Sequence, residues 1–103
     1  MEERIVRFAA VLEANPANEL ARFSLAKALF DEGFFDESIR HFCQLLTTKP
    51  DWMVAQILLG KSYLALGQTG DAKLSFLIAK NLAETQHHDG PFLELERMLE
   101  DLD

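Results

Sequence analysis

The chain has almost no cysteine and no long uncharged hydrophobic run, and both shortages narrow its class. Cys43 is the only cysteine, so no internal disulfide can form, and a reducing compartment would leave this thiol free. No segment reaches the roughly 20 apolar residues that a membrane-spanning helix needs. The start, Met1-Glu2-Glu3-Arg4, lacks the basic, apolar and small-residue order of a signal peptide. The sequence therefore predicts a cytoplasmic protein without a membrane partner.

Positive charge is also scarce. Ten Lys and Arg residues stand against 17 Asp and Glu residues, giving a formal net charge of −7. A surface of this sign repels phosphate backbones, so nucleic acid is not an expected partner. Much of the excess lies in residues 89–103, which contain six carboxylates and one arginine, Arg97. The last segment is predicted to be the acidic end of the fold.

Apolar residues, by contrast, are abundant enough for a core. They make up 49% of the chain, and charged residues make up 26%. This mixture is typical of a globular protein rather than a disordered one. A chain of 103 residues fits one domain, and folding at this size buries roughly two thirds of the extended surface. We therefore expect one domain that folds without disulfides or a structural metal.

The sequence repeats itself at a spacing of 34 residues. At this spacing Phe8, Phe42 and Phe76 fall into register, and we expect all three to be buried in the core. Aromatic residues, prolines and glycines rarely coincide by accident, so the repeat is a strong signal of a solenoid architecture. The other matching pairs are Pro16 with Pro50, Gly33 with Gly67, Leu25 with Leu59, Ala21 with Ala55, Lys27 with Lys61, Ile5 with Ile39 and Leu12 with Leu46.

Apolar residues recur with helical spacing between these landmarks, and no segment alternates like a strand. The prediction is an all-α fold, with bends at Gly33 and Gly67 and N-caps at Asn18 and Asp51. The expected helices lie near residues 2–14, 18–32, 36–48, 52–66, 70–87 and 91–102.

The repeats resemble the tetratricopeptide repeat, whose pattern is Trp-x2-Leu-Gly-x2-Tyr, then Ala-x3-Phe, then Pro. One repeat reads Gln56-x2-Leu59-Gly60-x2-Tyr63, then Ala72-x3-Phe76, with Glu84 at the proline position. The other reads Arg22-x2-Leu25-Ala26-x2-Leu29, then Ser38-x3-Phe42, and closes at Pro50. Both depart from the pattern at the Trp position.

This resemblance implies an α-α superhelix of antiparallel helix hairpins, similar to small stand-alone tetratricopeptide proteins. We expect residues 1–16 to form the second helix of an incomplete repeat. Repeats would occupy residues 17–50 and 51–86, and a turn with an acidic capping helix would occupy residues 87–103. The cap carries Leu95, Met98, Leu99 and Leu102, which have the spacing of a first repeat helix displaced by five residues.

Ligands of this family commonly lie along the concave face, at positions two, five, nine and twelve of each first helix. The resemblance therefore implies a non-catalytic module that binds a peptide or helix of an unknown partner protein in an apolar groove. Alternatively, these apolar residues are half buried by neighbouring helices, and the lysines are solvated or pair with Glu96 and Glu100. The corresponding residues are Leu20, Phe23, Lys27, Phe30, Val54, Ile57, Lys61 and Leu64.

Two further interpretations concern partners. The family's clamp for chaperone C-termini needs asparagines that this sequence lacks, since Ser24 and Leu58 stand at position six. Chaperone binding is therefore not predicted. A short stack with an apolar face can instead bury that face against a second copy, so a homodimer is the main alternative. Phe34, beside the first bend, is expected to be exposed and Phe35 to be buried.

Catalysis and cofactors have little support. His87, His88 and Asp89 could form a small metal or proton-transfer site, but adjacent histidines point in different directions and lack helical ligand spacing. Cys43 follows the core Phe42 and has no placed base, so it is interpreted as a packing residue. We expect no enzyme activity, no cofactor and no metal. The single tryptophan, Trp52, is expected to staple a helix entry to its neighbour.

Overall fold

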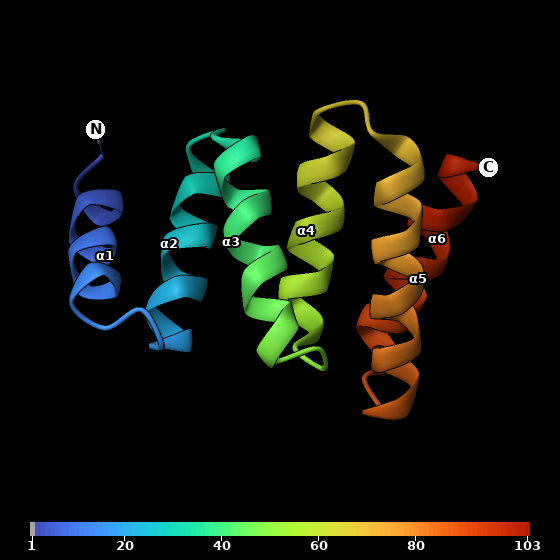
Figure 1. Cartoon of the computed structure of the whole chain (residues 1–103). Helices are drawn as coiled ribbons and strands as arrows, with labels where there is room; N and C mark the ends of the chain where they lie inside the picture. Colours follow the sequence, from blue (N-terminus) through green and yellow to red (C-terminus); the bar gives the residue numbers. More distant parts are fainter. Residues whose placement is uncertain (1) are drawn as a thin grey trace.

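Six helices, joined by turns of three or four residues, make up the computed structural model, which describes residues 2–103. Figure 1 shows them side by side in chain order, with α6 behind α5. No strand occurs in the described residues, so the predicted all-α hairpin superhelix is confirmed. The helices are α1 (Glu3–Ala14), α2 (Glu19–Asp31), α3 (Phe35–Thr48), α4 (Met53–Ala65), α5 (Thr69–Thr85) and α6 (Asp89–Leu102).

Glycines form the turns inside the two hairpins α2–α3 and α4–α5. Gly33 and Gly67 have φ angles of +83° and +75°, in the left-handed region that a side chain resists. In the first of these turns the Phe34 N–H donates to the Leu29 carbonyl at 2.8 Å, and the second turn has the equivalent bond. This is the hydrogen bond of a Schellman motif, which satisfies carbonyls left free at a helix end. The predicted bends are confirmed.

Prolines mark the other kind of turn, before α2 and before α4. Asn18 caps α2 as predicted, since its side chain accepts a hydrogen bond from the Ala21 N–H at 3.0 Å. The predicted cap at Asp51 is wrong: Trp52 is the N-cap of α4, and no side chain caps this end. The Trp52 ring stacks on Phe23 of α2, with centroids 4.6 Å apart. Aromatic packing therefore fixes the entry of α4, as the staple interpretation expected.

The turn between α5 and α6 is of the same type as the two glycine turns, although it contains no glycine. His87 has a φ of +60°, and the His88 N–H donates to the Ala83 carbonyl at 2.8 Å. Helix α5 continues to Thr85 because Glu84 stands where the earlier segments have proline. Helix α6 therefore begins at Asp89, two residues earlier than predicted. It packs mainly against α5.

Phe42 and Phe76 are fully buried, as predicted, at the centre of the two hairpins. Phe8 is only partly buried, because within the described residues no helix lies on the outer side of α1. Helix α4 approaches the Phe76 ring closely at Gly60: a Cβ there would lie 2.5 Å from the ring. The small residue that the repeat pattern requires at this position is thus explained by packing.

Candidate functional site

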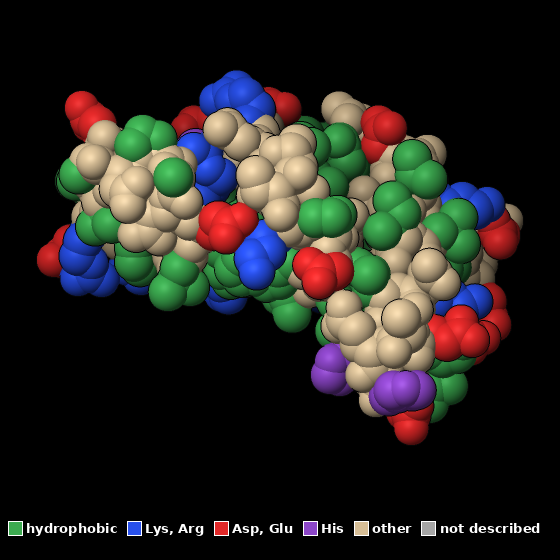
Figure 2. Space-filling model, turned by 60° about the horizontal axis from the view of Figure 1, so that its bottom comes forward, with side chains coloured by type: hydrophobic (Ala, Val, Ile, Leu, Met, Phe, Trp, Pro, Cys, Tyr) green, Lys and Arg blue, Asp and Glu red, His purple; other side chains and the backbone are tan. Residues whose placement is uncertain are grey.

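The predicted concave face is formed by α2 and α4, which contact each other. Leu20 is the most open of its residues, with 68% of its surface exposed, and Val54 and Leu64 are also exposed. Hydrophobic side chains gather along the lower, inward-curving edge of the molecule in Figure 2. Exposed large apolar groups in one region are typical of an interaction surface.

The two aromatic residues of this face take part in packing. Phe23 lies between Trp52, on which it stacks, and Phe42, whose ring it meets edge-on at 6.2 Å. Phe30 meets the Phe35 ring edge-on, with centroids 5.6 Å apart. Both are half buried, as is Ile57. The aliphatic residues therefore provide most of the accessible apolar surface.

The two lysines differ in their surroundings. Lys27 Nζ donates to Asp31 Oδ2 at 3.0 Å, one helical turn away. Lys61 is half buried, and none of the ion pairs between described residues includes it. The pairing of the lysines with Glu96 and Glu100 is wrong, because no ion pair between described residues joins them.

Two clefts lie on the other side of the stack, each at a Trp position of the repeat pattern. At about 100° per residue, Gln56 and Tyr63 lie on the opposite side of α4 from Val54 and Lys61. Arg22 is equivalent to Gln56 by the 34-residue spacing. The missing tryptophans are visible in the sequence, but the clefts at these positions were not predicted from it.

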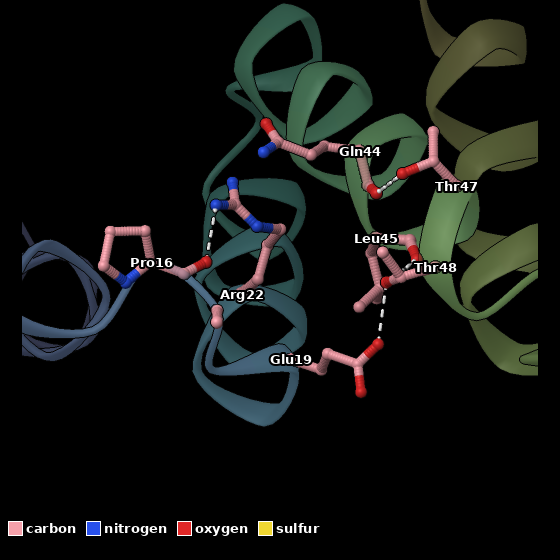
Figure 3. Close-up of a pocket in the computed structure, with 8 residues that line it drawn as sticks. Pro16, Glu19, Arg22, Gln44, Leu45, Thr47 and Thr48 are labelled. Carbon is pink, nitrogen blue, oxygen red and sulfur yellow. Dashed lines mark hydrogen bonds between the residues drawn. The ribbon is translucent and has the colours of Figure 1, made fainter.

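We call the first of these the Arg22 cleft. Figure 3 shows Arg22 extending from α2 toward the Pro16 carbonyl, with the Gln44 side chain above it on α3. The guanidinium donates to the Pro16 carbonyl at 3.2 Å and to His41 Nδ1 at 3.0 Å. The cleft has a volume of about 180 Å³. Its lining residues are Pro16, Ala17, Glu19, Arg22, Gln44, Leu45, Thr47 and Thr48.

Hydrogen bonds also join the two helices that line the Arg22 cleft. At its lower edge the Thr48 hydroxyl donates to Glu19 at 2.7 Å, which ties the end of α3 to the start of α2. The pKa of His41 is lowered, first by burial and then by the charges of Arg22 and Arg40. A neutral imidazole can accept the hydrogen bond from Arg22.

The second, the Gln56 cleft, lies between α3, α4 and α5 and has a volume of about 290 Å³. Its walls are mainly apolar, and polar groups occur at its floor and one end. Burial, followed by the hydrogen bond to Cys43, raises the pKa of Tyr63 to about 12. Its lining residues are Cys43, Leu46, Thr47, Gln56, Leu59, Tyr63, Asp71, Leu74, Ser75 and Ile78.

The residues considered for metal or proton chemistry lie at the α5–α6 turn. His87 is the left-handed residue of this turn, His88 is the N-cap of α6 and Asp89 is its first residue. Within residues 2–103 no group of three or more His, Cys, Asp or Glu side chains could hold a metal ion. No helix in this range is long and apolar enough to cross a membrane.

Sequence comparisons find similarity to a short part of much longer proteins. No family model matches the sequence. Over 81 residues, 79% of this chain, the sequence is 28% identical to human and 27% identical to mouse protein O-mannosyl-transferase TMTC3. The chain spans only 9% of the length of these relatives.

Solved structures match nearly the whole chain. Protein BPP2914 from Bordetella parapertussis is 26% identical, with a TM-score of 0.85, covering 99% of this chain and 89% of that one. A tetratricopeptide repeat domain protein from Salinibacter ruber is 22% identical, with a TM-score of 0.75, covering 86% and 90%. This fold serves in general as a protein-interaction module. With its 34-residue repeat and paired helices, the chain has the tetratricopeptide-repeat fold that its sequence predicted.

Proposed function

We propose that the protein is a non-catalytic interaction module in the cytoplasm, which binds a helix or extended segment of a partner protein along the inner face of α2 and α4. The observation that carries the proposal is the exposure of Leu20, Val54 and Leu64 on these two helices. Neighbouring helix axes lie ~8–10 Å apart. Apolar side chains on one face of a partner helix could therefore contact the exposed apolar residues of both α2 and α4.

Charge is expected to orient the partner. Lys61 can offer its ammonium group to a carboxylate of the ligand, because it has no ion pair among the described residues. Lys27 is already shared with Asp31 and would contribute less. We therefore expect the partner segment to be amphipathic, with an acidic residue opposite the middle of α4.

A peptide library displayed on phage and selected against the purified protein tests the proposal. Selected peptides should lose at least tenfold in affinity, measured by fluorescence anisotropy, for the double variant Leu20→Glu/Val54→Glu. The matched control is Leu66→Glu/Leu77→Glu, which places the same two charges at exposed leucines away from this face. Equal weakening by both variants, or by neither, would contradict the proposal.

Self-association through the same face is the competing proposal. Burying Leu20 and Val54 against a second copy would produce a dimer that the Glu variant separates. Analytical ultracentrifugation of both proteins over a range of concentrations distinguishes the two proposals. A mass of one chain throughout would eliminate the homodimer on this face and leave the peptide partner.

A further inference from the structure

The Gln56 cleft lies opposite the proposed peptide groove, so any role it has is additional to the function proposed above. Helix α4 forms its floor, and α3 and α5 form its walls. Helices α3 and α5 do not contact each other. The cleft is open because Gln56 stands where the repeat pattern has a tryptophan, whose indole would fill much of this space.

Two buried polar side chains in this cleft have no hydrogen-bond partner. Gln56 and Ser75 are only 7% and 5% exposed. Neither side chain takes part in the hydrogen bonds found within residues 2–103, whereas the buried Ser38 and Ser62 bond to each other at 3.2 Å. The polar atoms of Gln56 and Ser75 are not among the buried atoms that lack a partner in residues 2–103, so they remain accessible from the cleft. A ligand that enters the cleft can therefore pair with them.

The amide of Gln56 limits what this ligand can be. A glutamine side chain both donates and accepts, and its natural complement is another amide, which can exchange two hydrogen bonds with it. The Ser75 hydroxyl adds a donor or acceptor, and the protonated Tyr63 hydroxyl adds another. Asp71 lies in the lining and disfavours an anionic ligand. The polar part of the ligand is therefore a neutral amide.

The walls and the volume define the rest of the ligand. Leu74 and Ile78 are exposed on α5, and Leu46 faces them from α3 across the cleft. A cavity of about 150 Å³ already holds a benzene-sized group. The Gln56 cleft, at about 290 Å³, has room for one ring-sized or branched side chain with its adjoining amide. Sites for drug-sized molecules are commonly larger, at about 300 to 1,000 Å³.

We propose that the Gln56 cleft is a second binding site, on the outer side of the stack, which takes one large apolar side chain of an extended peptide together with the backbone amide beside it. The side chain lies between Leu46, Leu74 and Ile78, and the amide pairs with Gln56. A partner protein can thus contact the inner face with one segment and this cleft with another.

A capped amino acid is the smallest probe of this arrangement. N-acetyl-phenylalanine N-methylamide carries both the ring and the neutral amides. N-acetyl-glycine N-methylamide lacks the side chain, and N-acetyl-phenylalanine methyl ester lacks one N–H. We expect only the first to perturb the Gln56 side-chain amide, Ser75 and Ile78 in ¹H–¹⁵N and methyl NMR spectra of the full chain. Equal shifts with the glycine probe, or shifts confined to Leu20 and Val54, would overturn the proposal.

Cys43 provides a second, independent measurement. It lines the cleft and is the only cysteine of the chain, so alkylation by iodoacetamide reports on this place alone. A bound probe should slow the alkylation in proportion to its occupancy. An unchanged rate at probe concentrations that saturate the NMR shifts would show that the probe binds elsewhere.

Variants separate recognition from folding. Gln56→Leu keeps the size of the side chain but removes the amide, and should weaken the phenylalanine probe about tenfold. Arg22→Gln changes the equivalent position of the other repeat and should leave binding unchanged. Gln56→Trp should fill the cleft and abolish binding. If that variant does not fold, Gln56→Leu still decides: unchanged affinity would overturn the amide pairing.

Discussion

The two outer clefts both contain the Trp position of a repeat, but most of their other lining residues differ. Within the described part of the chain, the residue at this position is hydrogen-bonded in the first cleft and unpaired in the second. In the first, Arg22 bonds to the Pro16 carbonyl and to His41. In the second, Gln56 stands at the same repeat position, and its side chain has no hydrogen bond within residues 2–103 while its polar atoms remain accessible. The equivalent of His41 is Ser75, which cannot reach across the cleft as an imidazole does.

The difference shows how a repeat position can change its role while the fold stays the same. Both repeats lack the tryptophan of the family pattern, so other groups must fill the space of its indole. A long charged side chain does so in the first repeat by tying a turn to two helices. A shorter amide in the second repeat leaves room for an external group. The same substitution should therefore change the free energy of unfolding with opposite sign in the two clefts.

Truncating the buried aromatic residues should have the largest effect, and it should be the same in both repeats. Phe42 and Phe76 are both fully buried, so Phe42→Ala and Phe76→Ala should each lower the free energy of unfolding by ~3–5 kcal/mol. Urea denaturation followed by circular dichroism measures this. If only one variant is destabilised, the difference between the repeats extends into the core and is not confined to the clefts.

The small residue opposite each phenylalanine should break that symmetry. Gly60→Ala places a Cβ 2.5 Å from the Phe76 ring and should cost ~1–3 kcal/mol despite the better helix propensity of alanine. The first repeat already has Ala26 at this position, so Ala26→Gly is the reverse change. It should cost about 1 kcal/mol through propensity and lost packing. A Gly60→Ala protein that is more stable than the parent would show that the ring moves aside freely.

Replacing Arg22 or Gln56 by leucine should change the free energy of unfolding in opposite directions. Arg22→Leu removes the hydrogen bonds to Pro16 and His41 and should lower the free energy of unfolding by ~1–2 kcal/mol. Gln56→Leu loses no hydrogen bond within the protein and adds apolar contact to Leu46 and Ile78. It should be neutral or stabilise the fold by up to ~1 kcal/mol. Equal destabilisation by the two changes, in matched thermal melts, would mean that Gln56 has a partner inside the protein.

Much of the fold could be predicted because a few residues act through the backbone. Gly33 and Gly67 determine turns by their φ angles, and the spacing of the buried phenylalanines determines which helices pair. The type of the last turn could not be read in this way, because His87 adopts a left-handed angle that favours glycine. Only the absence of a proline at Glu84 indicated that α5 would continue.

The candidate sites were harder to predict, because exposure depends on neighbours that are distant in sequence. The spacing places Phe23 and Leu20 on one helix face, but only the stacking of Trp52 distinguishes a half-buried ring from an open leucine. The concave face as a ligand site and the repeat boundaries stay predictions. The clefts require three helices to be positioned together, and this information is not contained in any local pattern.

A smaller effect concerns proton binding in the Arg22 cleft. Burial and the charges of Arg22 and Arg40 lower the pKa of His41 below its ordinary value of 6.5, while Glu37 opposes the shift. The unfolded chain binds this proton first as the pH falls. The stabilising contribution of neutral His41 is therefore present above pH 6.5 and is lost as the pH falls through the folded pKa.

NMR titration of the His41 ring tests the direction of this pKa shift. Arg22→Gln should raise the pKa of His41 toward its ordinary value without restoring it, since burial is the larger cause. The control is Gln56→Glu, which changes the equivalent cleft and should leave this titration unaffected. A pKa of His41 at or above 6.5 in the parent protein would contradict the hydrogen bond from Arg22 to Nδ1.

The last prediction concerns the Gln56 cleft and has the smallest effect on stability near neutral pH. Tyr63 is the only tyrosine, so phenolate absorbance reports on it alone. Its midpoint should lie near 12 in the folded protein, against an ordinary value of 10.0. Because the unfolded chain loses this proton first, the stabilising contribution is complete below pH 10 and declines as the pH rises toward 12. Titration in denaturant provides the ordinary value for the same chain. A folded midpoint near 10 would mean that water already hydrates the Tyr63 hydroxyl, and the cleft would then lack the buried donor that its proposed ligand requires.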